Sequence, residues 1–390
     1  MKITAIHEQS VSLRSSLRNA YINFSEMTVS VVAIVSDVYR QGRPLIGYGF
    51  HSNGRYAPSE IIRQRLVPRL LAASPEDLLE DDGANISPVR AWQVMMTNEK
   101  PGGHGERAVA VGTVDMALWD LAAKIEEKPL YQLFADRYRG GQADADVYVY
   151  AAGGYYYPGK GITGLQDEIK RFLDQGYLDV KIKIGGAPLA EDLQRIEAVL
   201  SLLDRRQSLA VDANGRFDLP TALAYAEALT PYRDRIKWYE EAGDPLDFDL
   251  NARVAEVSPV PIATGENLFS WQDSRNLIRY GGMKADRDYL QMDPALSYGL
   301  VEYLRIIAML EEHGWSPRRC IPHGGHQLTL HIAAGLGLHG NESYPGVFEP
   351  FGGFADHIPV EAGRVRLPDV PGIGIETKAE LMKVFAPLTS

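Results

Sequence analysis

A regular alternation of short apolar runs with longer amphipathic stretches begins near residue 145 and constrains the fold of this chain most strongly. Eight strand-like runs follow one another, at 146–153, 178–185, 208–215, 235–242, 261–267, 288–295, 318–325 and 340–345. The stretches between them, such as 188–203 and 301–313, have helical periodicity. Repeated strand and helix units predict a parallel sheet, and eight units suit a β/α barrel of ordinary size. A doubly wound open sheet would have the same local pattern.

The first third of the chain has a different pattern, which predicts a mixed α+β region. Residues 2–14 and 27–38 alternate apolar and polar side chains as half-buried strands do, and 45–50 is another short strand. Residues 108–125 have apolar side chains at helical spacing. Three segments rich in polar residues or glycine, at 15–28, 47–57 and 98–107, are predicted loops, where binding residues are often found.

Charge and cysteine content exclude several classes of protein. The 390 residues include 40 lysines and arginines against 51 aspartates and glutamates, a formal net charge of −11, which argues against binding to nucleic acid or anionic membranes. The single cysteine, Cys320, excludes an intrachain disulfide and favours a reducing compartment. Because the chain also has no apolar run of about 18 residues and no apolar signal segment at its start, we expect a cytoplasmic protein.

Charged residues stand near the ends of successive strand-like runs at almost equal intervals. The steps from Lys183 to Asp212, Glu240, Glu266, Asp293 and His323 are 29, 28, 26, 27 and 30 residues. Any one acidic residue at a strand end could equally be a helix cap or a solvated loop residue. Five near-equal steps instead predict one shared height at the carboxyl ends of the barrel strands, where barrel active sites assemble, and this chemistry favours the barrel over the open sheet.

Three of these residues form a candidate metal site. Asp212, Glu240 and Glu266 follow three neighbouring strands, and their carboxylates cannot approach one another without a cation or a proton. All three offer hard oxygen ligands, which favours Mg²⁺. The set contains neither cysteine nor a histidine pair, which disfavours zinc. The sequence therefore predicts one Mg²⁺ ion.

Candidate proton-transfer groups lie on both sides of this site. Lys181 and Lys183 share one face of a strand because side-chain direction alternates along it. Such pairs are common on exposed edge strands, but here the strand lies within a run of barrel strands. Each ammonium disfavours the other's proton, so one can become a general base. His323, with Asp293 one strand earlier, can be an oriented acid.

These motifs together resemble the enolase superfamily, mandelate racemase subgroup. They are Lys181-x-Lys183, Asp212-x-Asn214, Trp238-Tyr239-Glu240-Glu241, Gly265-Glu266-Asn267, and Asp293 with His323. The resemblance implies an α+β capping domain over 1–140, a modified (β/α)7β barrel over 141–364, and a segment of about 365–390 that returns to the cap. It also implies Asp212, Glu240 and Glu266 as ligands of one Mg²⁺ per subunit, and a homo-oligomer, either a dimer or an octamer. The family commonly has proline after the Glu-Glu pair, whereas Ala242 follows here, so the assignment to Glu240 rests on alignment to the first glutamate.

Within that subgroup, five segments are similar to those of the D-tartrate dehydratases. They are 18–21, 53–56, 98–107, 151–160 and 340–345. This resemblance implies a lyase that converts D-tartrate to oxaloacetate. It also implies five substrate contacts, namely Lys100, Asn19, Asn53, Tyr156 and Glu342. In such enzymes mobile loops of the cap, here 15–28 and 47–57, close over the substrate.

The resemblance implies a mechanism in which a proton α to a carboxylate is removed and a β-hydroxyl then leaves. Lys183 removes the C2 proton, and Lys181 stabilises the carboxylate and lowers the pKa of Lys183. His323, held by Asp293, protonates the departing C3 hydroxyl. Lys100 binds the second carboxylate of the substrate.

Other readings use the same residues. Dehydration of another acid sugar, such as a hexarate or hexonate, needs the same metal and base, and a racemase would use the same lysine and histidine. A non-catalytic ligand-binding barrel is a further alternative. The fold and the metal ligands cannot separate these functions because specificity lies in the loops.

Overall fold

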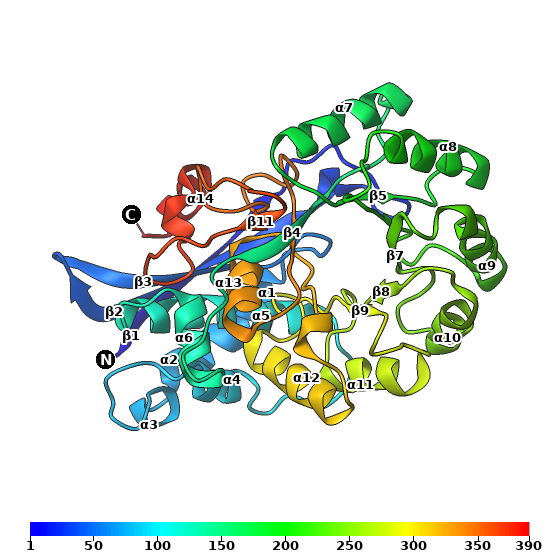
Figure 1. Ribbon diagram of the computed structural model, residues 1–390. Coiled ribbons are helices and arrows are strands. Elements are labelled where there is room, and N and C mark those ends of the chain that lie inside the picture. The colour runs from blue at the N-terminus through cyan, green and yellow to red at the C-terminus, as the bar shows by residue number, and fades with distance from the viewer. Residues whose placement is uncertain (390) are drawn as a thin grey trace.

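An antiparallel sheet of three strands forms the N-terminal part of the molecule (Figure 1). The computed structural model describes residues 1–389. The strands are β1 (Ile3–Ser12), β2 (Thr28–Arg40) and β3 (Arg43–Phe50), in that order, with the 3-10 turn η1 (Phe24–Glu26) before β2. The helices that follow are α1 (Ser59–Ile61), the π-helical segment η2 (Ile62–Leu66), α2 (Val67–Ala72), α3 (Pro75–Leu78), α4 (Pro88–Met95), α5 (Glu106–Ile125) and α6 (Leu130–Tyr138). The predicted strands and the predicted helix of this region are confirmed.

Helix α5 lies directly against β3 on one side and against the rest of the molecule on the other. A Cβ at Gly49 would lie 2.3 Å from the carbonyl oxygen of Thr113, so the close approach of helix and strand requires glycine. A Cβ at Gly112 would lie 2.5 Å from the carbonyl oxygen of Ala295. The all-round apolar character of α5 follows from these contacts, because a helix buried on every side has no solvent face.

A parallel sheet forms the second part of the molecule and has the strand order β10-β4-β5-β6-β7-β8-β9. Its strands are β4 (Val147–Ala152), β5 (Val180–Lys183), β6 (Leu209–Asp212), β7 (Ile236–Glu240), β8 (Ile262–Thr264), β9 (Tyr289–Leu290) and β10 (Asn341–Ser343), and β11 (Arg364–Val365) pairs antiparallel with β4. The helices of this part are α7 (Gly161–Asp174), α8 (Leu189–Leu200), α9 (Leu219–Ala228), α10 (Phe248–Val257), α11 (Trp271–Tyr280), α12 (Leu300–Glu312) and α13 (Gln327–Leu336), with 3-10 turns η3 (Thr230–Tyr232) and η4 (Pro317–Arg319). Figure 1 shows α7 to α12 in an arc around the curled sheet. The predicted barrel-type fold with an α+β cap is confirmed.

The seventh predicted strand, 318–325, differs from the prediction. It follows β9 in an extended path, but only Cys320 pairs with Leu290, as an isolated parallel bridge. Pro322 has no N–H to donate to a ladder, and Gly324, at φ 118°, turns the chain away. The segment keeps two backbone hydrogen bonds, from Ile321 N–H to the Leu290 carbonyl oxygen at 2.8 Å and from His323 N–H to the Gln291 carbonyl oxygen at 3.4 Å, but it does not extend into a regular ladder.

The C-terminal segment lies beside the first sheet. The 3-10 turn η5 (Ile375–Thr377) leads into α14 (Ala379–Thr389), which contacts β1 and β2. The ring of Phe385 packs on that of Tyr48 with centroids 4.9 Å apart. Within residues 1–389, none of the helices has both the length and the apolar character needed to cross a membrane.

Candidate active site

Strand register brings three charged residues to one height at the carboxyl edge of the parallel sheet. Lys183, Asp212 and Glu240 are the last residues of β5, β6 and β7. Lys183 pairs in register with Asp212, and Asp212 pairs with Glu240. Glu266 lies just beyond the end of β8. The near-equal steps in the sequence therefore correspond to one level in the fold.

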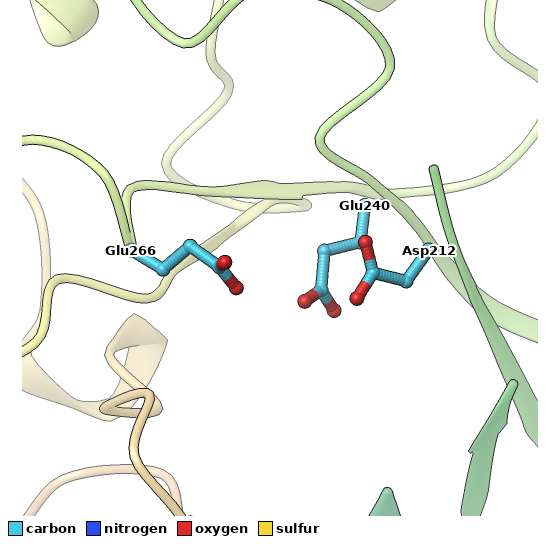
Figure 2. Close-up of side chains that lie close together, drawn as sticks. All are labelled: Asp212, Glu240 and Glu266. Atoms are coloured by element: carbon cyan, nitrogen blue, oxygen red, sulfur yellow. The ribbon is translucent and has the colours of Figure 1, made fainter. Parts of the chain in front are cut away.

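The three carboxylates of Asp212, Glu240 and Glu266 form a compact cluster. Each contributes an oxygen that lies within 4.8 Å of the others, and Figure 2 shows the side chains reaching toward one another from separate strand ends. Trp238 Nε1 and Gln291 Nε2 donate to Glu240 Oε2 at 2.7 and 2.9 Å. Burial and the charge of Asp212 raise the pKa of Glu240 to about 8. Three converging hard oxygen donors, two of them fully buried, fit a divalent cation such as Mg²⁺.

The second glutamate of the pair, Glu241, is engaged elsewhere. Asn267 Nδ2 donates to both of its carboxylate oxygens, at 2.8 and 3.1 Å. The backbone of Glu241 has φ 40°, so its side chain points in a different direction from that of Glu240. The geometry thus groups the first glutamate, and not the second, with Asp212 and Glu266.

Both lysines of β5 are buried and paired with carboxylates. Lys181 Nζ lies 2.6 Å from Glu240 Oε1 and 2.8 Å from Glu342 Oε1, and Lys183 Nζ lies 2.5 Å from Asp212 Oδ2. Burial acts to lower the pKa of Lys183, but the charge of Asp212 outweighs it and raises that pKa. The nearby ammonium of Lys181 opposes this rise without cancelling it.

The predicted histidine and aspartate pair is formed. His323 Nδ1 lies 2.7 Å from Asp293 Oδ2, and His323 Nε2 lies 3.0 Å from the hydroxyl of Tyr344. Burial acts to lower the pKa of His323, but the charge of Glu266 and the hydrogen bond to Asp293 outweigh it and raise the pKa to about 10. The contact with Asp293 thus favours the protonated imidazole, which is the state required of an acid.

A cavity of about 240 Å³ opens beside these groups. Its wall includes the predicted residues Asn19, Asn53, Lys183, Glu266 and His323. It is further lined by Tyr21, Ile22, Phe24, Gly54, Arg55, Tyr155, Asn214, Gly215, Glu241, Asp244, Pro245, Asn267, Leu296 and Tyr344. A larger and more open groove of about 720 Å³, beside α3 and α4, contains none of the predicted site residues. The smaller cavity is therefore the candidate active site.

Three predicted substrate contacts lie outside this wall. Lys100 is exposed on the 98–107 loop and is not a lining residue. The hydroxyl of Tyr156 donates to Asp192 Oδ1 at 2.6 Å, away from the cavity. Glu342 is fully buried behind the wall, where it pairs with Lys181.

Fourteen lining residues were not predicted as site residues, and Tyr155, Tyr344 and Arg55 are three of them. Tyr155, Tyr344 and Arg55 all lie in segments that carry the family resemblance, but the pattern gave no reason to choose them over their neighbours. The side chains of the adjacent residues Tyr155 and Tyr156 point in different directions. Which of the two faces the cavity depends on the path of the backbone, which the sequence does not show.

Two family comparisons cover most of the chain. Residues 164–381 match the Enolase C-terminal domain-like family. Residues 18–135 match the Mandelate racemase / muconate lactonizing enzyme, N-terminal domain. The chain belongs to the enolase superfamily. Within it, the N-terminal match places the chain in the mandelate racemase and muconate lactonizing enzyme subgroup.

Characterised members of this superfamily are similar over most of their length. An arabinonate dehydratase of Saccharolobus solfataricus is 28% identical over 345 residues, which are 84% of each chain. A 3,6-anhydro-alpha-L-galactonate cycloisomerase of Streptomyces coelicolor is 30% identical over 377 residues, 93% of this chain and 92% of that protein.

Solved structures of the superfamily have the same fold. A racemase from Streptomyces coelicolor with bound magnesium has a TM-score of 0.79 at 26% identity and covers 99% of each chain. An L-talarate dehydratase from a Polaromonas species, complexed with Mg and L-glucarate, has a TM-score of 0.76 at 25% identity over 95% of this chain and 92% of that one.

Proposed function

We propose that this superfamily member is a Mg²⁺-dependent hydro-lyase that converts D-tartrate to oxaloacetate and water. The observation that carries the proposal is the presence of Lys183 and His323 in one cavity beside a cluster of three carboxylates. Lys183 ends β5 and His323 lies in the segment that follows β9, so strands β6 to β9 separate the two groups and they reach the cavity from different sides. One can therefore remove a proton from a carbon while the other protonates a leaving group on the next carbon.

Asp212, Glu240 and Glu266 would hold the cation. When bound there, Mg²⁺ supplies positive charge that offsets the negative charge developing on the substrate carboxylate and on its own ligands. With its charge shared with the cation, Asp212 would attract the Lys183 ammonium less, and the pKa of Lys183 would fall toward the range of a general base. Lys181, fixed by Glu240 and Glu342, adds a repulsion that acts in the same direction.

On the other side of the cavity, Asp293 fixes the tautomer and orientation of the His323 ring. The Nδ1 proton is bonded to the carboxylate, so the proton that His323 can transfer is the one on Nε2. Its transfer toward the C3 hydroxyl completes the loss of water. The enol that remains becomes oxaloacetate by gaining a proton at carbon.

The size and the charge of the cavity favour a short diacid. Its volume, about 240 Å³, lies below the roughly 300–1,000 Å³ of sites for drug-sized ligands. Apart from Lys183 and His323, Arg55 is the only cationic side chain in the described wall. Its guanidinium donates to Asn267 Oδ1 and stacks on Phe269 at 4.9 Å. We assign the second carboxylate of the substrate to Arg55, and its hydroxyls to Asn19 and Asn53.

Replacement of Arg55 by methionine should lower kcat/KM for D-tartrate by about 10- to 100-fold, because a charge-assisted hydrogen bond to the second carboxylate is lost. Glycerate has the same α-proton and β-hydroxyl but no second carboxylate, so kcat/KM for glycerate should change little. Steady-state kinetics on both acids measure the difference.

Lys100→Met is the matched control, since it removes a cation that lies outside the cavity wall. It should leave the ratio of the two acids unchanged. If Lys100→Met lost the preference for the diacid and Arg55→Met kept it, Lys100 would be the residue that binds the second carboxylate.

A second candidate is dehydration of a longer acid sugar, which is favoured by the relatives. An L-talarate/galactarate dehydratase of Salmonella typhimurium is 27% identical over 317 residues, and the arabinonate dehydratase is similarly related. Product detection with D-, L- and meso-tartrate, galactarate and arabinonate, with and without EDTA, tests both candidates. We expect oxaloacetate from D-tartrate alone and only with Mg²⁺. If only the longer acids are dehydrated, D-tartrate is not the substrate and the second candidate function is correct.

A further inference from the structure

Tyr344 occupies a position that the mechanism above does not use. It follows β10, it is 1% exposed, and its ring packs edge-on against Phe348 with centroids 5.2 Å apart. Its side chain nevertheless lines the cavity together with His323. A buried phenol at a cavity wall is a rigid hydrogen-bonding group, since packing fixes its ring and leaves only its hydroxyl proton free to turn.

The hydrogen bonds of His323 determine what the hydroxyl of Tyr344 can do. Asp293 is acceptor-only as a carboxylate, and its other oxygen accepts from the backbone N–H of Ala295 at 2.8 Å. His323 Nδ1 must therefore donate to Asp293, at 2.7 Å, which leaves Nε2 to face the Tyr344 oxygen at 3.0 Å. When His323 carries both ring protons, as an acid must, Nε2–H donates and the Tyr344 oxygen accepts.

The phenolic proton then has no acceptor within the described chain. Across residues 1–389, His323 is the one hydrogen-bonding partner of the Tyr344 hydroxyl. That hydroxyl cannot donate back to an Nε2 that is itself protonated, so its proton is directed to whatever occupies the cavity. The nearest chemistry that needs a proton there is the departing hydroxyl of the substrate.

We propose that Tyr344 is a catalytic residue that donates its proton directly to the leaving hydroxyl and is reprotonated by His323. This inference rests on the proposed dehydration. In the step, the C3–O bond breaks and its electron pair stays with oxygen, which takes the phenolic proton and leaves as water. The Nε2 proton of His323 moves to the Tyr344 oxygen at the same time, so the tyrosine ends neutral and the imidazole ends neutral. No other reactant is needed.

Tyr344→Phe, which keeps the ring and removes only the hydroxyl, tests the proposal. The protein is the full chain with Mg²⁺, and the substrate is D-tartrate in deuterated water. Mass spectrometry follows wash-in of deuterium at C2, and product formation follows dehydration. We expect dehydration to fall by at least about 100-fold while C2 exchange stays within about threefold of the unmodified chain, because an acid is lost and the base is not.

Two variants complete the comparison. His323→Asn should have the same phenotype, with dehydration lost and exchange kept. Tyr303→Phe is the fold control, because the hydroxyl of Tyr303 is buried in α12 and has no hydrogen-bond partner. It should change neither rate.

Each other result overturns the proposal. Dehydration by Tyr344→Phe at the rate of the unmodified chain would make His323 the direct donor. Parallel loss of exchange and dehydration would reduce Tyr344 to a structural or substrate-binding role. If the unmodified chain dehydrates neither D-tartrate nor any acid of the panel above, the proposed function fails and the role of Tyr344 fails with it. If the unmodified chain dehydrates one of these acids and Tyr344→Phe dehydrates it at the same rate, only the proposed role of Tyr344 fails.

Discussion

Replacement of Lys183 by alanine should lower the rate of D-tartrate dehydration by about 10²- to 10⁴-fold, the usual contribution of a general base. Exchange of the C2 proton with deuterated solvent should fall to background as well, because the same group performs both. Lys183 ends β5 in the cavity wall, and its ammonium is already oriented by Asp212 at 2.5 Å. Product assays and mass spectrometry of recovered substrate measure the two losses.

The control for this variant is another paired lysine of the barrel, Lys237. It lies on β7 and contacts Asp179 at 3.0 Å, away from the cavity. Lys237→Met should stay within a few-fold of the unmodified chain, as expected at the stabilising end of a barrel. If Lys183→Ala still exchanged the C2 proton, the base would have to be another residue.

Replacement of Glu240 by glutamine should weaken Mg²⁺ binding strongly, because a direct ligand loses its charge. Loss of a residue that only contacts a ligand typically costs about 10- to 100-fold in affinity, and we expect a larger loss here. The amide has the same shape, so the contacts with Trp238 and Gln291 on the other oxygen remain possible. Titration calorimetry of the EDTA-treated protein measures the affinity without any need for turnover.

Glu241→Gln is the internal comparison, because it changes the adjacent residue in the same way. The carboxylate of Glu241 is held by Asn267, outside the cluster, so the loss of Mg²⁺ affinity should be smaller than in Glu240→Gln. The reverse order would make the second glutamate the ligand and would revise the choice between the two.

The level of the candidate site along the barrel could be predicted from the sequence because it depends on the length of the repeating βα unit. Each βα unit spans nearly the same number of residues, and parallel strands place their carboxyl ends at one edge. Lys183, Asp212 and Glu240 accordingly pair in register, and His323 meets Asp293 as expected from their neighbouring segments. The regular geometry of strands and helices is therefore enough to predict that these residues lie at one level.

Loop residues could not be predicted in the same way, because no period fixes a loop path. Tyr156 and Lys100 were chosen from segment resemblance, whereas the structure places Tyr155 in the cavity wall and leaves Lys100 exposed. Arg55 and Tyr344 belong to no repeating pattern, so the sequence does not distinguish them as site residues. These choices depend on where one backbone turn ends, which sequence spacing does not determine.

The protonation of Lys183 was also beyond prediction from the sequence. The spacing of Lys181 and Lys183 indicated mutual repulsion, but it could not indicate that Asp212 on the next strand lies close enough to reverse the effect. A pKa depends on the sum of burial and all nearby charges, so it is a property of the assembled barrel rather than of one motif.

Asn19, Asn53 and Arg55 reach the cavity from loops of the N-terminal sheet, whereas Lys183 ends β5 of the parallel sheet and His323 lies in the extended segment after β9. If these residues have the proposed roles, substrate recognition and proton transfer are encoded in different stretches of the gene. A short insertion or a few substitutions in 18–24 or 51–57 would then change which acid binds and leave the proton-transfer residues unchanged. Such an arrangement makes new specificities accessible through small evolutionary steps.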